Sequence, residues 1–429
     1  MTKQKQIPFK PIELQLGIRT KEDKKITLPI EIVKIVYSYV SFDNTTIRIA
    51  IKEWKKNKTE CEKKYGPISL WCTNMVKDMS KLFCDMNNFN EDISLWDVSN
   101  VRNMSSMFIY CSRFNKNLSL WNMSKVKDAS YMFSGCIAFN QDLSLWNVSN
   151  IKDMTNMFND CKNFNQDLNS WDVSNVCYMS AMFNGCVKFN KNLNSWNVHN
   201  VRYMHWMFNN CKNFNQYLNS WNVSNVIGMS SMFRECVVFN QDLNLWNVSN
   251  VKDMSSMFNN CENFNQDLSS WNVHNVRYMN WMFNNCKNFN QYLNSWNVSN
   301  VIGMSSMFRE CVVFNQDLNL WNVSNVIDMS SMFEECVIFN QCLNSWNVSN
   351  VIDMNSMFAF CCEFNQNLSS WNVHNVCNTE SMFYECKIFN KKIDSIKLNL
   401  CDINSMLYKY KMFKYLIPFS LLIVFSEYI

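Results

Sequence analysis

The chain has 429 residues, a formal net charge of +4, 48% hydrophobic and 18% charged residues, so a core can form and a wholly disordered protein is excluded. Only 6 Gly, 5 Pro and 4 His are present. The sequence contains no GxGxxG or GxxxxGK[ST] loop, which excludes the nucleotide enzymes built on those loops. Four histidines leave little room for histidine-based metal or acid–base chemistry.

Charge is distributed unevenly along the chain. Residues 1–66 carry 15 Lys and Arg against 8 Asp and Glu, a net +7, and the remainder has a net charge of −3. A nucleic-acid binder needs a concentrated basic face. We therefore expect no nucleic-acid partner and interpret the basic N-terminal segment as a solvated one.

The first 65 residues differ from the rest. Residues 28–40 read LPIEIVKIVYSYV, which predicts a helix that starts at Pro29 and carries an apolar face, and IRIAIKEW follows at 47–54. Leu-Pro-x-Glu-Ile, an amphipathic helix and a later Trp resemble an F-box. The resemblance implies docking on a Skp1-like adaptor of a ubiquitin ligase through Leu28, Pro29, Ile32 and Ile35. The alternative is a small α-helical cap that shields the first repeat.

Residues 66–395 are internally repetitive. Trp recurs every 25 residues from Trp71 to Trp371, Cys from Cys111 to Cys386, and Asn from Asn90 to Asn390. A strict period means that each unit packs identically on the last, which predicts a solenoid of about thirteen units. Residues 196–251 recur as 271–326 with one change, His205 to Asn280. Such duplication is tolerated because each unit contacts only its neighbours.

One unit, residues 251–275, reads VKDMSSMFNNCENFNQDLSSWNVHN. Its first half has apolar residues at helical spacing, which predicts a short helix over 251–261 with Ser249 or Asn250 as N-cap. Its second half, 264–273, predicts a short strand with flanking turns. A strand and a helix in 25 residues match the length of a leucine-rich repeat, so the expected fold class is an α/β repeat solenoid.

The recurring columns M-x-x-M-F-x-x-C-x-x-F-N-Q-D-L-S-S-W-N-V-S-N-V resemble the short-repeat branch of the BspA-like leucine-rich-repeat family, found in mollicute, protist and giant-virus proteins. The resemblance implies a right-handed strand–helix coil and a role in binding or adhesion, without catalysis. Bacterial surface members carry an export signal, whereas this chain starts MTKQKQIPFK without an apolar run. We therefore expect an intracellular, reducing location (the host cytoplasm for a viral protein) and keep a surface or adhesion protein as the alternative.

Most columns are interpreted as structural. Trp, Met, Phe and Leu are expected in the core, the two Asn columns in ladders that satisfy backbone groups, and the cysteines as buried free thiols. His199, His274 and His374 lie three and four repeats apart, too far for shared metal ligation. No cofactor or metal is expected.

Variable positions offer a candidate surface for a partner protein. Exposed Trp, Tyr and Arg are enriched at binding hot spots, and two related repeats supply them: Arg202, Tyr203, Trp206, Tyr217, Arg277, Tyr278, Trp281 and Tyr292. The alternative is sequence drift on a tolerant surface. No column pairs a nucleophile with a base or places two carboxylates together, so we expect no enzyme and no small-molecule substrate. The predicted function is a protein–protein interaction scaffold, in its sharper form an F-box-like substrate adaptor.

The Trp column breaks at Ile396, and residues 396–429 are expected to form a C-terminal cap or apolar tail. The apolar run YLIPFSLLIVF, 415–425, contains Pro418 and is shorter than the roughly 20 residues that a spanning helix needs. A cap is therefore favoured over a membrane contact.

Overall fold

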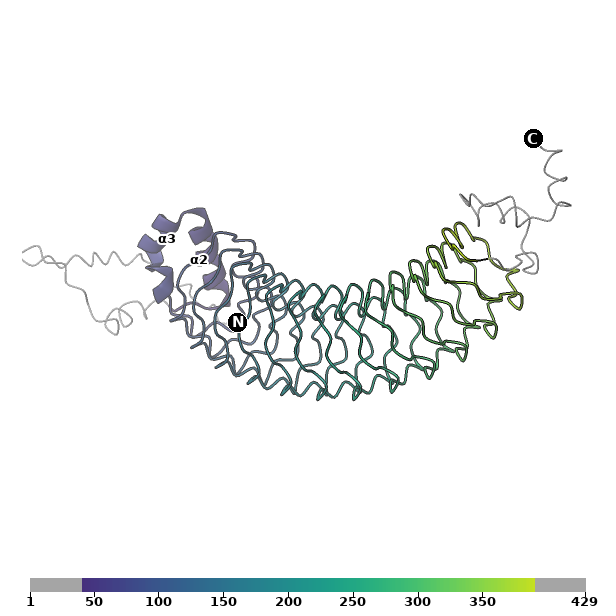
Figure 1. Ribbon diagram of the computed structural model, residues 1–429. Coiled ribbons are helices and arrows are strands. Elements are labelled where there is room, and N and C mark those ends of the chain that lie inside the picture. Colours follow the sequence, from purple (N-terminus) through teal and green to yellow (C-terminus); the bar gives the residue numbers. More distant parts are fainter. Residues whose placement is uncertain (1–40, 390–429) are drawn as a thin grey trace, which may run out of the picture.

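The computed structural model describes residues 41–389. The F-box-like positions Leu28, Pro29, Ile32 and Ile35 and the tail 396–429 lie outside this range. The described chain is a curved stack of similar coils, with two helices at its N-terminal end (Figure 1). Among residues 41–389, no helix has the length and apolar character needed to cross a membrane.

Two helices and a short 3-10 turn precede the coils. Helix α2 (Asn44–Lys56) begins after Asp43, whose carboxylate accepts the backbone N–H groups of Thr45 and Thr46. Helix α3 (Lys58–Tyr65) follows directly, and η1 (Ile68–Leu70) leads into the first repeat. The apolar face of α2 belongs to the same buried cluster as the repeats.

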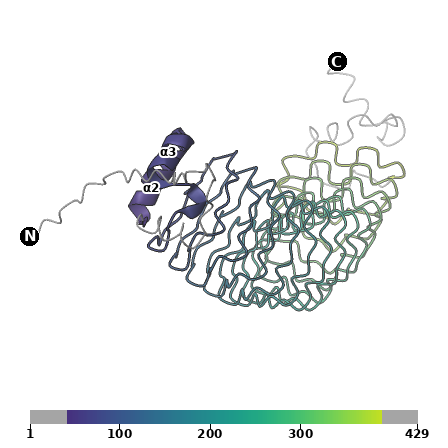
Figure 2. The same cartoon turned by 90° about the vertical axis from the view of Figure 1, so that its left-hand side faces the viewer.

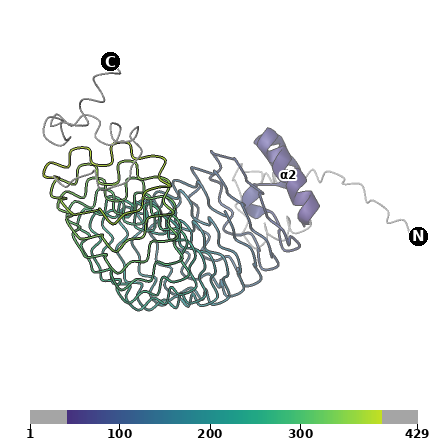
Figure 3. The ribbon, with the colours of Figure 1, turned by 90° about the vertical axis from the view of Figure 1, so that its right-hand side faces the viewer.

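Helix α2 covers the open end of the first repeat (Figures 2 and 3). The Trp54 ring packs edge-on against Phe89 at 5.7 Å. Arg48 donates from Nη1 to the Ser80 carbonyl at 2.7 Å, and the Asn44 side chain accepts the N–H of Lys77 at 2.8 Å. The helix therefore covers apolar surface and also satisfies backbone groups that no preceding repeat can pair with.

The repeats are joined by isolated parallel bridges, one residue per repeat, along a column of thirteen positions from Asp78 to Asn378. In the unit 251–275 the bridging residue is Asp253, in the first half. The predicted helix over 251–261 and the predicted strand within 264–273 are therefore wrong. Within the described repeats the first half is a series of turns and the second half has no bridge.

Backbone hydrogen bonds explain why no helix forms. The N–H groups of Met254, Ser256 and Phe258 donate to carbonyls of the next repeat at 2.8–3.0 Å instead of to carbonyls four residues back. Bonds from residue i to i−3, such as Met257 N–H to Met254 at 3.1 Å, close the turns between them. Turns of this kind bring every third or fourth side chain inward, so they reproduce the apolar spacing of a helix.

Two positions in every repeat have left-handed backbone, represented by Ser256 at φ 57° and Asn260 at φ 61°. A side chain at such a position costs about 1–2 kcal/mol, and Gly occupies only Gly135 and Gly185 of these columns. From Lys81 to Phe360, each left-handed N–H donates to the following repeat, as Ser256 does to Asn280 and Asn260 to Asn284, both at 2.8 Å. These inter-repeat bonds and the buried core offset the backbone cost.

The predicted core columns are confirmed. The thirteen Trp of the column are 2–3% exposed, and Trp246 stacks on Trp221 and Trp271 at 6.4 Å. Each indole N–H donates to a backbone carbonyl, which from Trp146 to Trp371 belongs to a Leu of the preceding repeat, as for Trp246 and Leu218 at 3.0 Å. The core is thus a continuous row of aromatic rings with satisfied polar atoms.

The predicted Asn ladders are also confirmed. The Asn240 side chain accepts the backbone N–H of Asn265 at 2.9 Å and an amide hydrogen of Gln266 at 2.9 Å. In the second ladder, Asn275 donates to the Ser249 carbonyl at 2.7 Å. Both ladders tie each repeat to the one before it, which helps to fix the stacking register.

The column cysteines are buried free thiols that hydrogen-bond between repeats. Cys261 donates from Sγ to the Phe233 carbonyl at 3.0 Å, and the same bond recurs along the column. Burial raises the pKa of these thiols, to about 12 for Cys111 and well above the usual value for Cys261. They are therefore protonated, unreactive packing residues.

Candidate functional site

Four neighbouring rings, of which Tyr178 and Trp206 are exposed and the other two half-buried, form what we call the Trp206 cluster: Tyr178, Tyr203, His205 and Trp206. Tyr178 stacks on Tyr203 at 6.1 Å, Tyr203 lies 5.9 Å from His205, and His205 lies 6.2 Å from Trp206, all between ring centroids. Trp206 is 50% exposed. Its backbone is left-handed at φ 56°, as at every equivalent position.

The duplicated repeat carries a smaller version, which we call the Trp281 patch: Tyr278 and Trp281, each 43% exposed. Asn280 replaces His205, and Asp253 replaces Tyr178. Within residues 41–389, no ring contact joins Tyr278 to Trp281, whereas His205 connects the rings in the Trp206 cluster. The two surfaces are thus related in position and differ in how their rings are held together.

The other predicted residues lie elsewhere on the coil. Tyr217 and Tyr292 are 46% and 48% exposed, on a different segment of the repeat, and no ring contact in the described chain joins Tyr217 to Trp206. Arg202 and Arg277 are exposed and line a groove instead. The eight predicted positions therefore lie in three separate parts of the surface. Arg202 and Arg277 line the groove, Tyr217 and Tyr292 lie on another segment of the repeat, and the remaining four belong to the Trp206 cluster and the Trp281 patch.

His205 occupies space left by a glycine in the next repeat. It lies 2.6 Å from the Ser230 hydroxyl through Nδ1, and a Cβ on Gly228 would overlap its ring. Burial lowers the pKa of His205 below its usual 6.5, and Asp253 partly opposes that shift. Gly228 is therefore needed for room at this point.

We expect Gly228→Ala to push His205 into solvent and raise its pKa toward 6.5, because the desolvation is removed. The pKa is measured by an NMR titration of the histidine ring signals. Gly303→Ala is the matched control: it stands against Asn280, so the His205 titration should not move. An unchanged His205 pKa in Gly228→Ala would show that the ring is not displaced.

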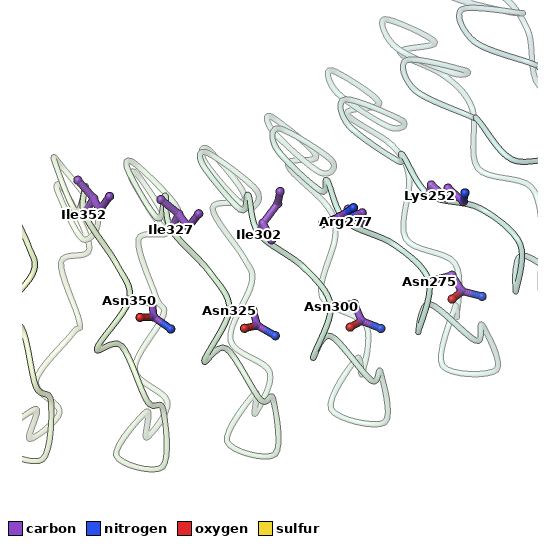
Figure 4. Close-up of a pocket in the computed structure, with 9 residues that line it drawn as sticks. All are labelled: Lys252, Asn275, Arg277, Asn300, Ile302, Asn325, Ile327, Asn350 and Ile352. Atoms are coloured by element: carbon purple, nitrogen blue, oxygen red, sulfur yellow. The ribbon is translucent and has the colours of Figure 1, made fainter.

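A groove that the sequence did not reveal runs along the stack between two columns (Figure 4). One row is formed by Asn275, Asn300, Asn325 and Asn350, and the other by the second residue of each repeat: Lys252, Arg277, Ile302, Ile327 and Ile352. The groove has a volume of about 730 Å³. A second stretch is lined by the same two columns further toward the N-terminus, including Arg202 and Ile227.

The predicted histidine column is polar and lies between repeats. His199 is 3.2 Å from the Asn222 amide, and His274 makes the equivalent contact with Asn297 at 3.1 Å. Among residues 41–389, no three His, Cys, Asp or Glu side chains are grouped so that they could hold a metal ion.

Two solved structures are similar to part of this chain. A TLR13–single-stranded RNA complex is similar over 72% of this chain, with 11% identity and a TM-score of 0.19. The Drosophila Toll–Spätzle complex is similar over 68%, with 13% identity and a TM-score of 0.23. The chain spans only 57% and 40% of those two proteins. Among curated proteins, none matches this sequence.

A family model matches nearly the whole repeat region, in four overlapping segments: residues 51–169, 143–244, 229–342 and 304–418. The segments continue from one to the next without a gap, as expected for a strict repeat. The family match thus supports, at the level of the repeat family, the resemblance that the recurring residues of the 25-residue unit indicate. The chain belongs to the family described as "Mycoplasma protein of unknown function, DUF285".

Proposed function

We propose that this protein is a non-enzymatic scaffold whose solenoid surface recognises a partner protein. The observation that carries the proposal is the Trp206 cluster, in which the exposed rings of Tyr178 and Trp206 are connected through the half-buried rings of Tyr203 and His205. The conserved geometry of the repeat does not need these rings, since Ser is the usual residue at the position of Trp206. Exposed Trp and Tyr typically supply most of the binding energy at protein interfaces.

The test is the variant Trp206→Ser/Trp281→Ser in the full chain. Proteins retained by the parent are identified, the partner is purified, and its Kd is measured by calorimetry for both chains. Loss of a hot-spot Trp costs about 2 kcal/mol or more, so the Kd should rise roughly thirty-fold. Tyr131→Ser is the matched control, because Tyr131 is exposed in the same column outside both patches. Equal affinity of parent and double variant would contradict the proposal.

The sharper form of the proposal is an F-box-like substrate adaptor, in which Leu28, Pro29, Ile32 and Ile35 bind a Skp1-like protein and the solenoid selects the target. Its support is the sequence resemblance alone. Trp54 of the F-box-like segment packs on Phe89 of the first repeat, which equally fits the cap alternative.

A purified Skp1-like adaptor should be retained by the full chain and released by Leu28→Ala/Pro29→Ala. Trp54→Phe is the second variant. It conserves the packing on Phe89 and leaves residues 28–35 unchanged, so it should still retain the adaptor. Absence of adaptor binding by the parent would assign the N-terminal segment to capping only.

A further inference from the structure

We infer that an exposed apolar stripe at the N-terminal end of the stack is the docking site for residues 28–40 of the same chain. The stripe, which we call the Leu stripe, consists of the residue before Trp in the first four repeats: Leu70, Leu95, Leu120 and Leu145. The inference goes beyond the proposed function and uses no residue of the Trp206 cluster or the Trp281 patch.

The Leu stripe is apolar where a repeat usually carries a hydroxyl. Leu120 and Leu145 are 79% and 75% exposed, and Leu95 is 43% exposed. Ser is the usual residue of this column in the later repeats, and Ser170 and Ser270 donate from their hydroxyls to a carbonyl of the preceding repeat at 2.9 and 2.8 Å. A Leu forgoes this hydrogen bond and exposes apolar surface to water, which points to a covering partner.

Only in the first four repeats are the leucines of this column consecutive. Leu245 and Leu320 occupy the same column, but each stands between repeats that carry Ser, and the two are copies of each other in the duplicated blocks 196–251 and 271–326. A single exposed leucine is common on protein surfaces and needs no partner. Four in adjoining repeats form a continuous row, because each repeat packs directly on the one before it.

The chain enters the structure beside the first member of the row. Ser41 forms a parallel bridge with Cys72, and the Phe42 N–H donates to the Cys72 carbonyl at 2.9 Å. Because the pairing is parallel, the chain that leads into Ser41 arrives on the same side as the residues before Cys72, which include Leu70. Residues 28–40 are therefore tethered at one end of the Leu stripe, and docking within one chain needs no association step.

The segment has the length and the apolar face that the row requires. A helix over 28–40 is about 20 Å long at about 1.5 Å per residue. Neighbouring repeats are about 4.8 Å apart at the backbone bridges, and the rings of Trp71 and Trp96 are 6.2 Å apart. Either spacing places Leu145 roughly 14–19 Å from Leu70 along the stack. The expected helix has one apolar face, formed by Ile32, Ile35, Val36 and Tyr39.

The test is hydrogen exchange of the full chain, read by mass spectrometry in the peptides that contain residues 28–40. Their amides should exchange about ten-fold or more slowly than in a synthetic peptide of the same residues, because docking protects them. Leu120→Ser/Leu145→Ser should remove this protection. The variant introduces the residue that the column usually carries, so the repeats should stay folded, and unchanged slow exchange of the Phe133 and Phe158 amides verifies that they do.

The matched control is Leu245→Ser/Leu320→Ser. It makes the same change in the same column, at residues that are each 72% exposed and lie outside the Leu stripe, so exchange of residues 28–40 should not change. On the side of the segment, Ile35→Asp should remove the protection because it places a charge on the apolar face. Lys34→Asp lies on the opposite face of the expected helix and should leave the protection intact.

Three results would overturn the inference. The first is exchange of residues 28–40 in the parent as fast as in the synthetic peptide. The second is protection that Leu120→Ser/Leu145→Ser leaves unchanged, since the segment is then covered elsewhere. The third is protection that disappears on dilution together with a fall in mass by light scattering, which would assign the Leu stripe to a second copy of the chain.

The measurement is independent of the proposed function, because it contains no partner and no adaptor. Leu28, Ile32 and Ile35 are also the positions that the F-box resemblance assigns to a Skp1-like protein. Adaptor binding by a parent whose segment is unprotected would remove the Leu stripe alone. Protection of the segment in a parent that binds no adaptor would support the Leu stripe and remove only the adaptor.

Discussion

Trp246→Ala is expected to lower the free energy of unfolding by about 3–5 kcal/mol. The indole is 2% exposed, stacks at 6.4 Å on a ring on either side, and donates to the Leu218 carbonyl. The substitution removes these contacts and leaves a cavity that the neighbouring coils cannot close, because every coil has the same fixed shape. The change is the difference between the free energies of unfolding of the parent and the variant, measured by urea denaturation and compared at the same m-value.

Trp206→Ala is the matched control for this prediction, since Trp206 is 50% exposed and makes no core contact of the Trp column. Its substitution should change stability by no more than about 0.5 kcal/mol. Equal losses in the two variants would mean that the Trp column is not the source of the stability.

The buried thiols should make the protein unfold steeply at alkaline pH. An unfolded Cys has a pKa of about 8.5, and burial raises the pKa of column thiols such as Cys211, Cys236 and Cys261 in the folded state. The folded state therefore binds protons more tightly. The resulting stability is complete below pH ~8.5 and falls above it by about 1.4 kcal/mol per pH unit for each thiol in the unfolding unit.

The variant Cys211→Ala/Cys236→Ala/Cys261→Ala should reduce this slope by about 4 kcal/mol per pH unit. The free energy of unfolding is measured by denaturant titration at several pH values between ~8.5 and ~10.5. Val223→Ala/Val248→Ala/Val273→Ala is the control: it removes buried apolar groups that do not titrate, so stability should fall and the slope should stay. Parallel slopes in the parent and the cysteine variant would contradict the linkage.

The repeat period and the core columns could be predicted from the sequence, because Trp246 and Cys261 recur at a fixed interval and are buried in every coil. The local backbone could not. Met254, Met257 and Phe258 have the spacing of a helix, and turns with i to i−3 bonds give the same spacing. Left-handed residues are usually marked by Gly, and here Ser and Trp occupy those positions without any signal.

The candidate surfaces show a similar division. Trp206 is visible in the sequence because it stands where Ser is the most frequent residue of the column, and its exposure follows from the burial of its neighbours. The groove is not visible, because Lys252, Arg277 and Ile302 differ in chemistry and resemble drift along the sequence. Only the stacking of the coils aligns them beside the Asn row.

The backbone ladder makes the two ends of the stack chemically unlike. Most N–H groups that cross between repeats donate to the following repeat, so the first repeat presents carbonyls such as that of Ser80, whereas the N–H of each second residue donates to the preceding repeat, as Arg102 does to Lys77. At this first edge the guanidinium of Arg48 in α2 donates a hydrogen bond to the carbonyl of Ser80. Helix α2 therefore pairs backbone groups at this edge of the ladder as well as covering the core.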